Sequence, residues 1–182
     1  MATSCSAYAL KGMGQECAGA VAGIKRLLIG ISSEWNVSAG TAQTITALSG
    51  KTTAATFYEY FITDESTSLT STLNVNNANG VKYYNNVIST TFNRMRPEKH
   101  IELVALANEK LVVIAVDNNN QGWFLGADGY VSATEETAQS GQSFDDLAGY
   151  QITLTHRSAT LPYGIAESLY SGKVDTPNVY EN

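Results

Sequence analysis

Residues 110–130 read KLVVIAVDNNNQGWFLGADGY, an apolar run, a polar turn and a second apolar run. Residues 111–116 form a continuous aliphatic and β-branched segment of strand length, and residues 123–125 resume the apolar pattern before Gly126. The intervening residues 117–122 are rich in Asn, Asp and Gly, which favour turns. This stretch therefore predicts a β-hairpin built for packing, because no catalytic group lies between its two strands.

The size and composition of the chain indicate one globular domain. It has 182 residues, of which 43% are hydrophobic and 15% charged. A chain of this length buries roughly two thirds of its unfolded surface, which is enough for a full core without disulfides. Ser, Thr and Asn fill many positions where a cytosolic enzyme carries Lys and Glu, and such a surface favours contact with neighbouring subunits.

The charge of the chain argues against specific nucleic-acid binding. Its net charge is −6, whereas affinity for phosphates needs clustered Lys and Arg. Positive charge is concentrated only at Lys25-Arg26 and within residues 94–99, where Glu98 interrupts the run. These positions are interpreted as a solvated face or a subunit contact.

The N-terminal residues do not resemble a secretory signal. They lack a cationic start and a long apolar core, and no apolar run elsewhere reaches membrane-spanning length. We therefore expect synthesis in the cytoplasm and no membrane partner. Cys5 and Cys17 are expected to be reduced thiols, since two cysteines without nearby histidines do not make a zinc site.

Three parts are predicted along the chain. Residues 1–22 are small and glycine-containing and look like an N-terminal arm that becomes ordered against a partner. Residues 23–168 form the β domain. Residues 169–182 are mostly polar, include Pro177 and are predicted to be a C-terminal tail.

The β domain is predicted to contain about eight strands. Residues 81–92 fit either a helix or a strand and are assigned to a strand, preceded by a turn over 76–80. Residues 138–149 are predicted to be a polar connection. The other strand candidates are 23–31, 32–38, 41–48, 55–63, 68–75, 111–116, 123–125 and 150–155, the last with Tyr150, Ile152 and Leu154 facing inward.

A single helix is predicted over residues 97–108. Pro97 suits its first turn, Glu98 suits the positive end of its dipole, and good helix formers fill the body. Its broad apolar face, which includes Ile101 and Val104, is expected to be covered by a sheet. The predicted fold class is thus mainly β, an antiparallel sandwich or barrel with one flanking helix.

No catalytic group can be assigned from the sequence. His100 and His156 are the only histidines, and neither lies in a zinc motif or a nucleophile elbow. Ser and Asp are so plentiful that a Ser-His-Asp trio chosen by hand carries no information. We assign no triad and no cofactor, and we do not predict an enzyme.

Two groups of acidic residues are weighed as metal or catalytic sites. Residues 117–122 with Asp128 partly match a calcium loop, but Gln121 departs from that pattern and a hairpin turn explains the same residues; whether the loop binds a cation stays open. Glu135-Glu136 and Asp145-Asp146 are neighbours expected in solvated loops. The ten tyrosines are interpreted mainly as packing residues.

The order of segments resembles a known family. A Cys and small-residue patch leads into GIKRLLIG, followed by a β region, a helix, VVIAVDNNNQGWFLG, GADGYVSAT and finally SGQSFDDLAGYQITLTHRS. Over residues 17–157 this pattern is similar to the tail-tube-like virion proteins of tailed bacteriophages. It consists of structural residues and contains no catalytic signature.

The resemblance implies a β-sandwich or barrel whose copies form a ring, usually a hexamer, around a channel. Rings of this kind stack through loops and arms, contact other tail or connector proteins, and let DNA pass without specific binding. The protein is then expected in the virion tail. An acidic channel would repel DNA phosphates, although net charge does not say which face is acidic.

Two alternatives stay open at this point. One is a ring at the head-tail junction in place of a repeated tube. The other is a fibre, decoration or carbohydrate-binding module, motivated by the tyrosines and the polar surface.

Overall fold

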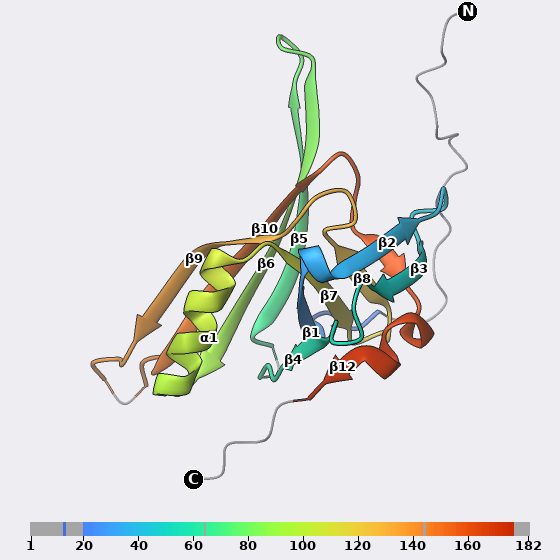
Figure 1. The fold of residues 1–182 in the computed structure, drawn as a ribbon. Coiled ribbons are helices and arrows are strands. Elements are labelled where there is room, and N and C mark those ends of the chain that lie inside the picture. Colours follow the sequence, from blue (N-terminus) through green and yellow to red (C-terminus); the bar gives the residue numbers. More distant parts are fainter. Residues whose placement is uncertain (1–12, 14–19, 64, 144, 177–182) are drawn as a thin grey trace, which may run out of the picture.

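The computed structural model of the chain describes residue 13 and residues 20–63, 65–143 and 145–176, which form twelve strands and one α-helix (Figure 1). The strands are β1 (Ile24–Ile31), β2 (Trp35–Ala39), β3 (Ile45–Gly50), β4 (Phe57–Tyr60), β5 (Thr67–Asn76), β6 (Val81–Asn93), β7 (Leu111–Asp117), β8 (Gly122–Leu125), β9 (Ser132–Gln139), β10 (Gly149–Ser158), β11 (Tyr163–Ile165) and β12 (Val174–Asp175). The α-helix α1 spans Pro97–Asn108, and three 3-10 helices are η1 (Ser32–Glu34), η2 (Glu167–Leu169) and η3 (Ser171–Lys173).

The strands form two main sheets and one separate hairpin. A six-stranded sheet has the order β11-β8-β7-β1-β4-β12, a four-stranded sheet has the order β5-β6-β10-β9, and β2 pairs with β3. Neighbouring strands are antiparallel except β12, which runs parallel to β4. The predicted mainly β, antiparallel class is confirmed in its sandwich form, and the sheets do not close into a barrel.

The central strands of the six-stranded sheet are buried on both faces. Along β7 every residue from Leu111 to Val116 is at most 4% exposed, so the continuous apolar run reflects a strand covered on both sides. Leu111, Val113 and Ala115 face one core, and the residues between them face another. The predicted hairpin over residues 110–130 is confirmed by the pairing of β7 with β8.

The first core lies between the two main sheets. Leu27 and Val113 from the six-stranded sheet join Ile88, Ile152 and Leu154 from the four-stranded sheet. The inward placement of Ile152 and Leu154, predicted from alternation, is confirmed by exposures of 2% and 1%.

The second core lies on the opposite face of the six-stranded sheet, under the β2–β3 hairpin and the η2–η3 segment. Trp35 stacks on Phe57 with ring centroids 4.2 Å apart. A Cβ on Gly30 would lie 2.8 Å from Trp35 Nε1, so the absence of a side chain there makes room for the indole.

Helix α1 has the bounds that the sequence predicts, but its apolar face is covered less than expected. Leu106 is buried and Leu103 packs against the first core, whereas Ile101 and Val104 are 75% and 61% exposed. The prediction that a sheet covers the whole face is therefore wrong. The helix lies beside the end of the four-stranded sheet and turns only one edge toward the core (Figure 1).

The four-stranded sheet contains β9, one of three strands that the sequence analysis missed; the other two are β11 and β12. Strand β9 begins at Ser132 and includes Glu135 and Glu136, which were placed in a loop, and it ends inside the predicted connection 138–149. The loop at Glu135-Glu136 and the start of the connection at residue 138 are therefore wrong predictions. They failed because β9 is an exposed edge strand, whose sequence lacks the alternation that burial of one face produces. Asp145 lies outside the strands as predicted.

The ends of the described chain are fixed to the body. The predicted arm over residues 1–22 lies mostly outside the described residues, as do both cysteines. Of the predicted tail, residues 169–176 pack onto the body: Tyr170 is 2% exposed and Val174 pairs with Phe57. Residues 177–182 lie outside the described part. Among the described residues, no helix is both long and apolar enough to cross a membrane.

Candidate functional site

The candidate functional surface is the face of the four-stranded sheet that points away from the first core, called here the outer face. On β10, Tyr150, Ile152, Leu154 and His156 are buried, so the residues between them point to the opposite side. Residues paired in register share a face. The outer face accordingly includes Ser68, Thr70, Thr72, Asn74, Tyr83, Asn85, Val87, Ser89, Thr91, Ser132, Thr134, Glu135, Thr137, Gln151, Thr153, Thr155 and Arg157.

The chemistry of the outer face is neutral and polar. Two of its side chains are charged, the acidic Glu135 and the basic Arg157, so their charges cancel. The others carry mainly hydroxyl and amide groups. The hydroxyl groups of Thr134 and Thr155 lie 2.9 Å apart and hydrogen-bond across two strands. Such a surface offers many weak hydrogen-bonding groups and little net field.

Both edges of the four-stranded sheet are exposed. Strands β5 and β9 form its two ends, and most residues of each are exposed. Edge strands present unpaired N–H and C=O groups to a further strand. The sheet can therefore be extended by a neighbouring chain at either side.

The β5–β6 hairpin extends beyond the body of the protein (Figure 1). Strand β10 pairs with β6 only as far as Tyr84, whereas β5 continues to pair with β6 up to the turn at Asn76 and Val81. Leu73 and Val75 on the hairpin are 46% and 49% exposed. Exposed apolar side chains on a projecting hairpin are typical of an interaction surface.

The structure brings Asp128, His156 and Ser158 together, a trio that the sequence analysis did not select. Ser158 Oγ donates to Asp128 Oδ2 at 2.5 Å, and His156 Nε2 lies 3.3 Å from Asp128 Oδ1 without hydrogen-bond geometry. A catalytic triad needs the serine on the imidazole, whereas here both residues face the carboxylate. His156 and Ser158 are buried and Asp128 is exposed, and the serine hydroxyl does not bond the imidazole.

His156 is 3% exposed, and its register partner Asn86 is 0% exposed. Neither ring nitrogen of His156 and neither amide atom of Asn86 forms a hydrogen bond with a described residue. Burial lowers the pKa of His156, and the charge of Asp128 opposes that shift. The protonation of His156 thus depends on its burial and on the charge of Asp128.

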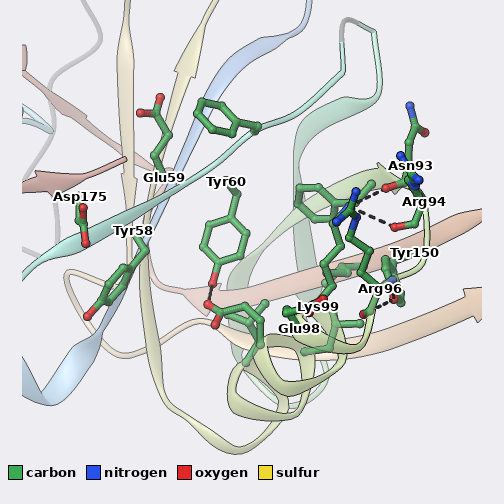
Figure 2. Close-up of a pocket in the computed structure, with 16 residues that line it drawn as sticks. Tyr58, Glu59, Tyr60, Asn93, Arg94, Arg96, Glu98, Lys99, Tyr150 and Asp175 are labelled. Atoms are coloured by element: carbon green, nitrogen blue, oxygen red, sulfur yellow. Dashed lines mark hydrogen bonds between the residues drawn. The ribbon is translucent and has the colours of Figure 1, made fainter. Parts of the chain in front are cut away.

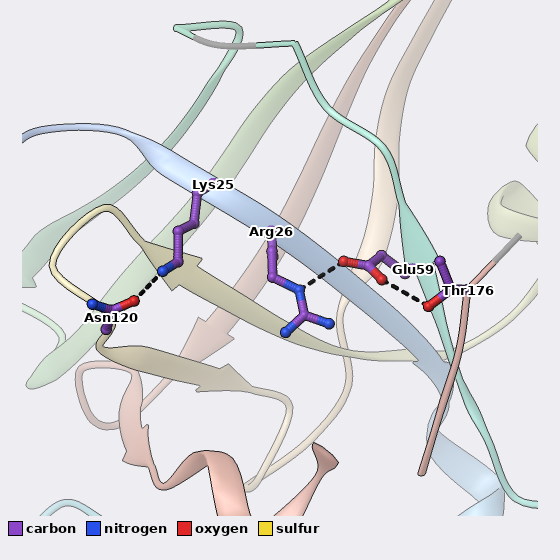
Figure 3. Close-up of polar contacts among 5 residues, drawn as sticks. All are labelled: Lys25, Arg26, Glu59, Asn120 and Thr176. Atoms are coloured by element: carbon purple, nitrogen blue, oxygen red, sulfur yellow. Dashed lines mark hydrogen bonds and ion pairs between the residues drawn. The ribbon is translucent and has the colours of Figure 1, made fainter. Parts of the chain in front are cut away.

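The turn over 117–122, weighed as a calcium loop, uses its polar groups within the protein. Asp117 Oδ1 accepts hydrogen bonds from the backbone N–H groups of Asn119 and Gln121, both at 2.9 Å. Its Oδ2 accepts one from Trp123 Nε1 at 3.1 Å. The Lys25 ammonium contacts Asn120 Oδ1 (Figure 3), so a cation of the protein already lies at this turn.

The same turn also holds the chain that leads into β1. Asn119 bonds both backbone groups of Val21, and Asn118 Nδ2 donates to the carbonyl of Ala22 at 2.6 Å. The Asn residues that predicted a turn therefore fix the end of the N-terminal segment as well.

A groove of about 480 Å³ lies between β4 and the start of α1 (Figure 2). Its floor is apolar and includes Tyr60, Phe92, Leu103, Leu106 and Ile152. The Tyr60 hydroxyl donates to the Glu102 carboxylate. Burial and this carboxylate raise the pKa of Tyr60, so its hydroxyl stays protonated.

One end of the groove is lined by three cationic residues, Arg94, Arg96 and Lys99, called here the basic cluster. Lys99 Nζ donates to the carbonyl oxygens of Asn93 and Arg94 at 2.6 and 3.2 Å. Burial lowers the pKa of Lys99, and the charges of Arg96 and Arg94 lower it further. Arg94 has φ 63, a left-handed conformation that is uncommon for arginine.

The other histidine lies near the same groove. The His100 ring meets the Tyr150 ring edge-on, with centroids 5.6 Å apart. It is exposed on α1, as is usual for a surface histidine.

In comparisons with known proteins, no protein-family model, curated protein or solved structure matches the chain.

Proposed function

We propose that the protein is a structural virion protein that forms rings of a tailed-phage tail tube, a conduit for genome ejection. The observation that carries this proposal is the four-stranded sheet, which is packed on one face, neutral and polar on the other, and exposed at both edges. The resemblance of residues 17–157 to tail-tube-like proteins supports it.

Ring closure uses the two edges of the sheet. Strand β5 of one copy lies beside β9 of the next, so that the four-stranded sheets of successive copies form one continuous wall. The edge at β5 and the edge at β9 differ in sequence, and a head-to-tail contact of this kind closes into a ring when the rotation between copies permits it. The ring is expected to contain six copies, as in the resembled family.

The outer face then lines the channel. Because it carries Glu135 and Arg157 among hydroxyl and amide side chains, the channel is neutral and not acidic. DNA phosphates find no cluster of Lys or Arg to bind, and the field is too weak to repel them strongly. The negative charge of the chain is located elsewhere on the subunit.

Stacking of rings uses the β5–β6 hairpin and the chain ends. The hairpin projects from the body and exposes Leu73 and Val75, which gives it an apolar surface to place against a neighbouring ring. A tube and a single head-tail junction ring differ in whether this contact repeats.

Electron microscopy of negatively stained protein, with its mass measured by light scattering, tests the proposal. Rings or tubes with a central pore are expected. A double substitution on the β5 edge, Ser68→Lys with Thr70→Lys, should prevent ring closure, because repeated Lys on an edge strand opposes pairing.

Gln151→Lys is the matched control for this edge variant, since Gln151 lies on the outer face of the inner strand β10. Combined with Thr153→Lys on the same strand, it adds the same two positive charges without touching an edge, and rings should persist. A pore-free monomer or trimer under all conditions would contradict the conduit function.

A second candidate function, a carbohydrate-binding module, is favoured by one observation. Tyr58 and Phe61 line the groove between β4 and α1 and are 47% and 52% exposed, and exposed aromatic rings are suited to stacking on sugars. A monomer whose glycan binding is lost in a Tyr58→Ala, Phe61→Ala variant would support this function over the tube.

A further inference from the structure

Helix α1 carries an apolar edge that no described residue of the chain buries. Leu103 and Leu106 face the first core, whereas Ile101 and Val104 are exposed. Helical residues three positions apart lie on the same face, so Ile101 and Val104 form one continuous surface, called here the α1 strip. An exposed apolar strip on a helix is typical of a surface that packs against another element.

The β5–β6 hairpin carries a second exposed apolar surface. Leu73 and Val75 point to the side of the sheet that faces the first core, because Leu69 pairs with the buried Ile88 and side chains alternate along β5. Leu73 lies level with the last residue of β10 and Val75 lies beyond it, so the first core does not cover them. Lys82 pairs with Val75 and shares this side. Leu73, Val75 and Lys82 are called here the inner hairpin face.

The two surfaces cannot meet within one chain. The hairpin belongs to the β5 edge of the four-stranded sheet, and α1 lies beside β9 at the opposite edge (Figure 1). Three strand spacings, roughly 14 Å, separate β5 from β9, and the hairpin projects away from the body. Each surface is therefore open to a second copy of the chain. Contact between two different surfaces of identical copies is head-to-tail, so it can repeat.

The two surfaces are complementary in charge as well as apolar. Lys82 is exposed and is the one charged residue between positions 67 and 93, so the hairpin is positive. Glu98 and Glu102 lie one turn apart on α1, and Glu98 is three residues before Ile101, beside the strip. Lys99 on the same helix donates to two backbone carbonyl groups. The flank of the α1 strip is therefore acidic where the hairpin brings a lysine.

The contact is small, which limits where it can act. Four apolar side chains cover far less than the roughly 1,200 Å² that a stable interface between two proteins buries. Two separate chains would therefore bind each other weakly through these surfaces. The contact gains strength when several copies engage at once, as two rings do.

We propose that the α1 strip of one copy binds the inner hairpin face of a second copy in the neighbouring ring. The apolar side chains of the two surfaces pack together, and Lys82 faces the acidic flank of α1. The α1 strip is then the receiving surface for the hairpin that stacks the rings, so its placement between rings rests on the proposed function.

Substitutions on both surfaces test the contact through the stacking of rings, followed by electron microscopy and sedimentation velocity. Val75→Glu or Val104→Lys alone sets a charge against apolar side chains, and each should raise the protein concentration needed for stacking about tenfold or more. The double variant brings the two opposite charges together, so stacking should largely recover. Rings that stack normally in both single variants would overturn the contact and leave the conduit function standing.

Val81→Glu is the matched control for Val75→Glu. Val81 lies on the same hairpin and is 45% exposed, close to the 49% of Val75. It pairs with Asn76 and therefore points to the opposite side of the sheet. Stacking should be unchanged in this variant, and an equal loss in the two hairpin variants would contradict a contact through the inner face.

Disulfide cross-linking tests the same contact whether or not rings form. In a chain with Cys5→Ser and Cys17→Ser, one preparation carries Val75→Cys and another carries Val104→Cys. Mixed in the presence of oxidised glutathione, they should give disulfide-linked pairs of chains. A mixture of Val81→Cys with Val104→Cys is the control and should give far fewer.

The outcomes separate the contact from the conduit. Linked pairs without pores in the electron microscope would support the contact and contradict the tube, whereas pores without linked pairs would do the reverse. Equal linking in the control mixture, or the absence of both pores and linked pairs, would also overturn the contact.

Discussion

The hydroxyl group of Tyr150 holds the backbone of Arg96 at both of its polar groups. It accepts a hydrogen bond from the Arg96 N–H at 3.0 Å and donates one to the Arg96 carbonyl oxygen at 3.1 Å (Figure 2). Arg96 is the N-cap of α1 and makes no side-chain capping bond. A core side chain from β10 thus fixes the point at which the helix begins.

Tyr150→Phe is expected to lower the free energy of unfolding by about 1–3 kcal/mol, because two backbone groups in a partly buried place lose their partner. Chemical denaturation measures the change. Tyr130→Phe is the control, since Tyr130 is 49% exposed and should change stability little. Equal losses in the two variants would mean that the hydroxyl of Tyr150 does not anchor the helix.

The ion pair between β1 and β4 should make stability depend on acid pH. Arg26 Nε donates to Glu59 Oε1 at 2.7 Å, and this bond lowers the pKa of Glu59 below its usual 4.5, with burial opposing the shift. The resulting stabilisation is present above pH 4.5 and is lost as the pH falls through the lower pKa of the folded state.

Glu59→Gln should therefore reduce stability near neutral pH by about 1 kcal/mol, and the difference from the unaltered chain should vanish in more acidic solution. Denaturation at a series of pH values measures this. Glu135→Gln, at an exposed position of the outer face, is the control. A constant difference at every pH would show that Glu59 acts through packing and not through its charge.

The buried His156 should destabilise the fold as the solution becomes acidic. Its pKa is lowered chiefly by burial from the usual 6.5, so the unfolded chain binds the proton more readily than the folded one. Stability is full above pH 6.5 and falls below it until the folded state is also protonated.

His156→Leu should flatten this dependence between about pH 7 and 5. The substitution by leucine removes no hydrogen bond to a described residue, because neither imidazole nitrogen forms one. His100→Leu, at an exposed position, should keep the original slope. If the slope survives in His156→Leu, another group titrates in this range.

The neutrality of the outer face can be tested by giving the proposed channel a positive charge. Thr153→Lys adds one lysine per copy at the centre of that face, and rings of the variant should retain duplex DNA at low salt and release it as salt rises. Filter binding measures the retention. Thr41→Lys, in the turn between β2 and β3, adds the same charge off the outer face and should leave DNA unbound; retention by both variants would point to net charge instead of the channel.

The local sequence was sufficient to predict those strands and the helix whose residues show a regular pattern of burial or a clear terminal residue. The apolar run in β7, the alternation in β10 and the Pro97 start of α1 each carry their signal within a few residues. Strand β9 carries no such signal, because an exposed edge strand has no buried face to impose alternation. Its pairing with β10 stabilises it from outside its own sequence.

The sequence by itself determined a mainly β chain with one helix from Pro97 to Asn108, because patterns of burial and turn chemistry are local. Only the tertiary structure decided which distant side chains meet. Asp128 reaches His156, Tyr150 reaches Arg96, and Thr176 reaches Glu59 through the order and register of the strands. Such contacts depend on which strands become neighbours. The order of the strands is set by the need to bury apolar side chains on both faces of the six-stranded sheet.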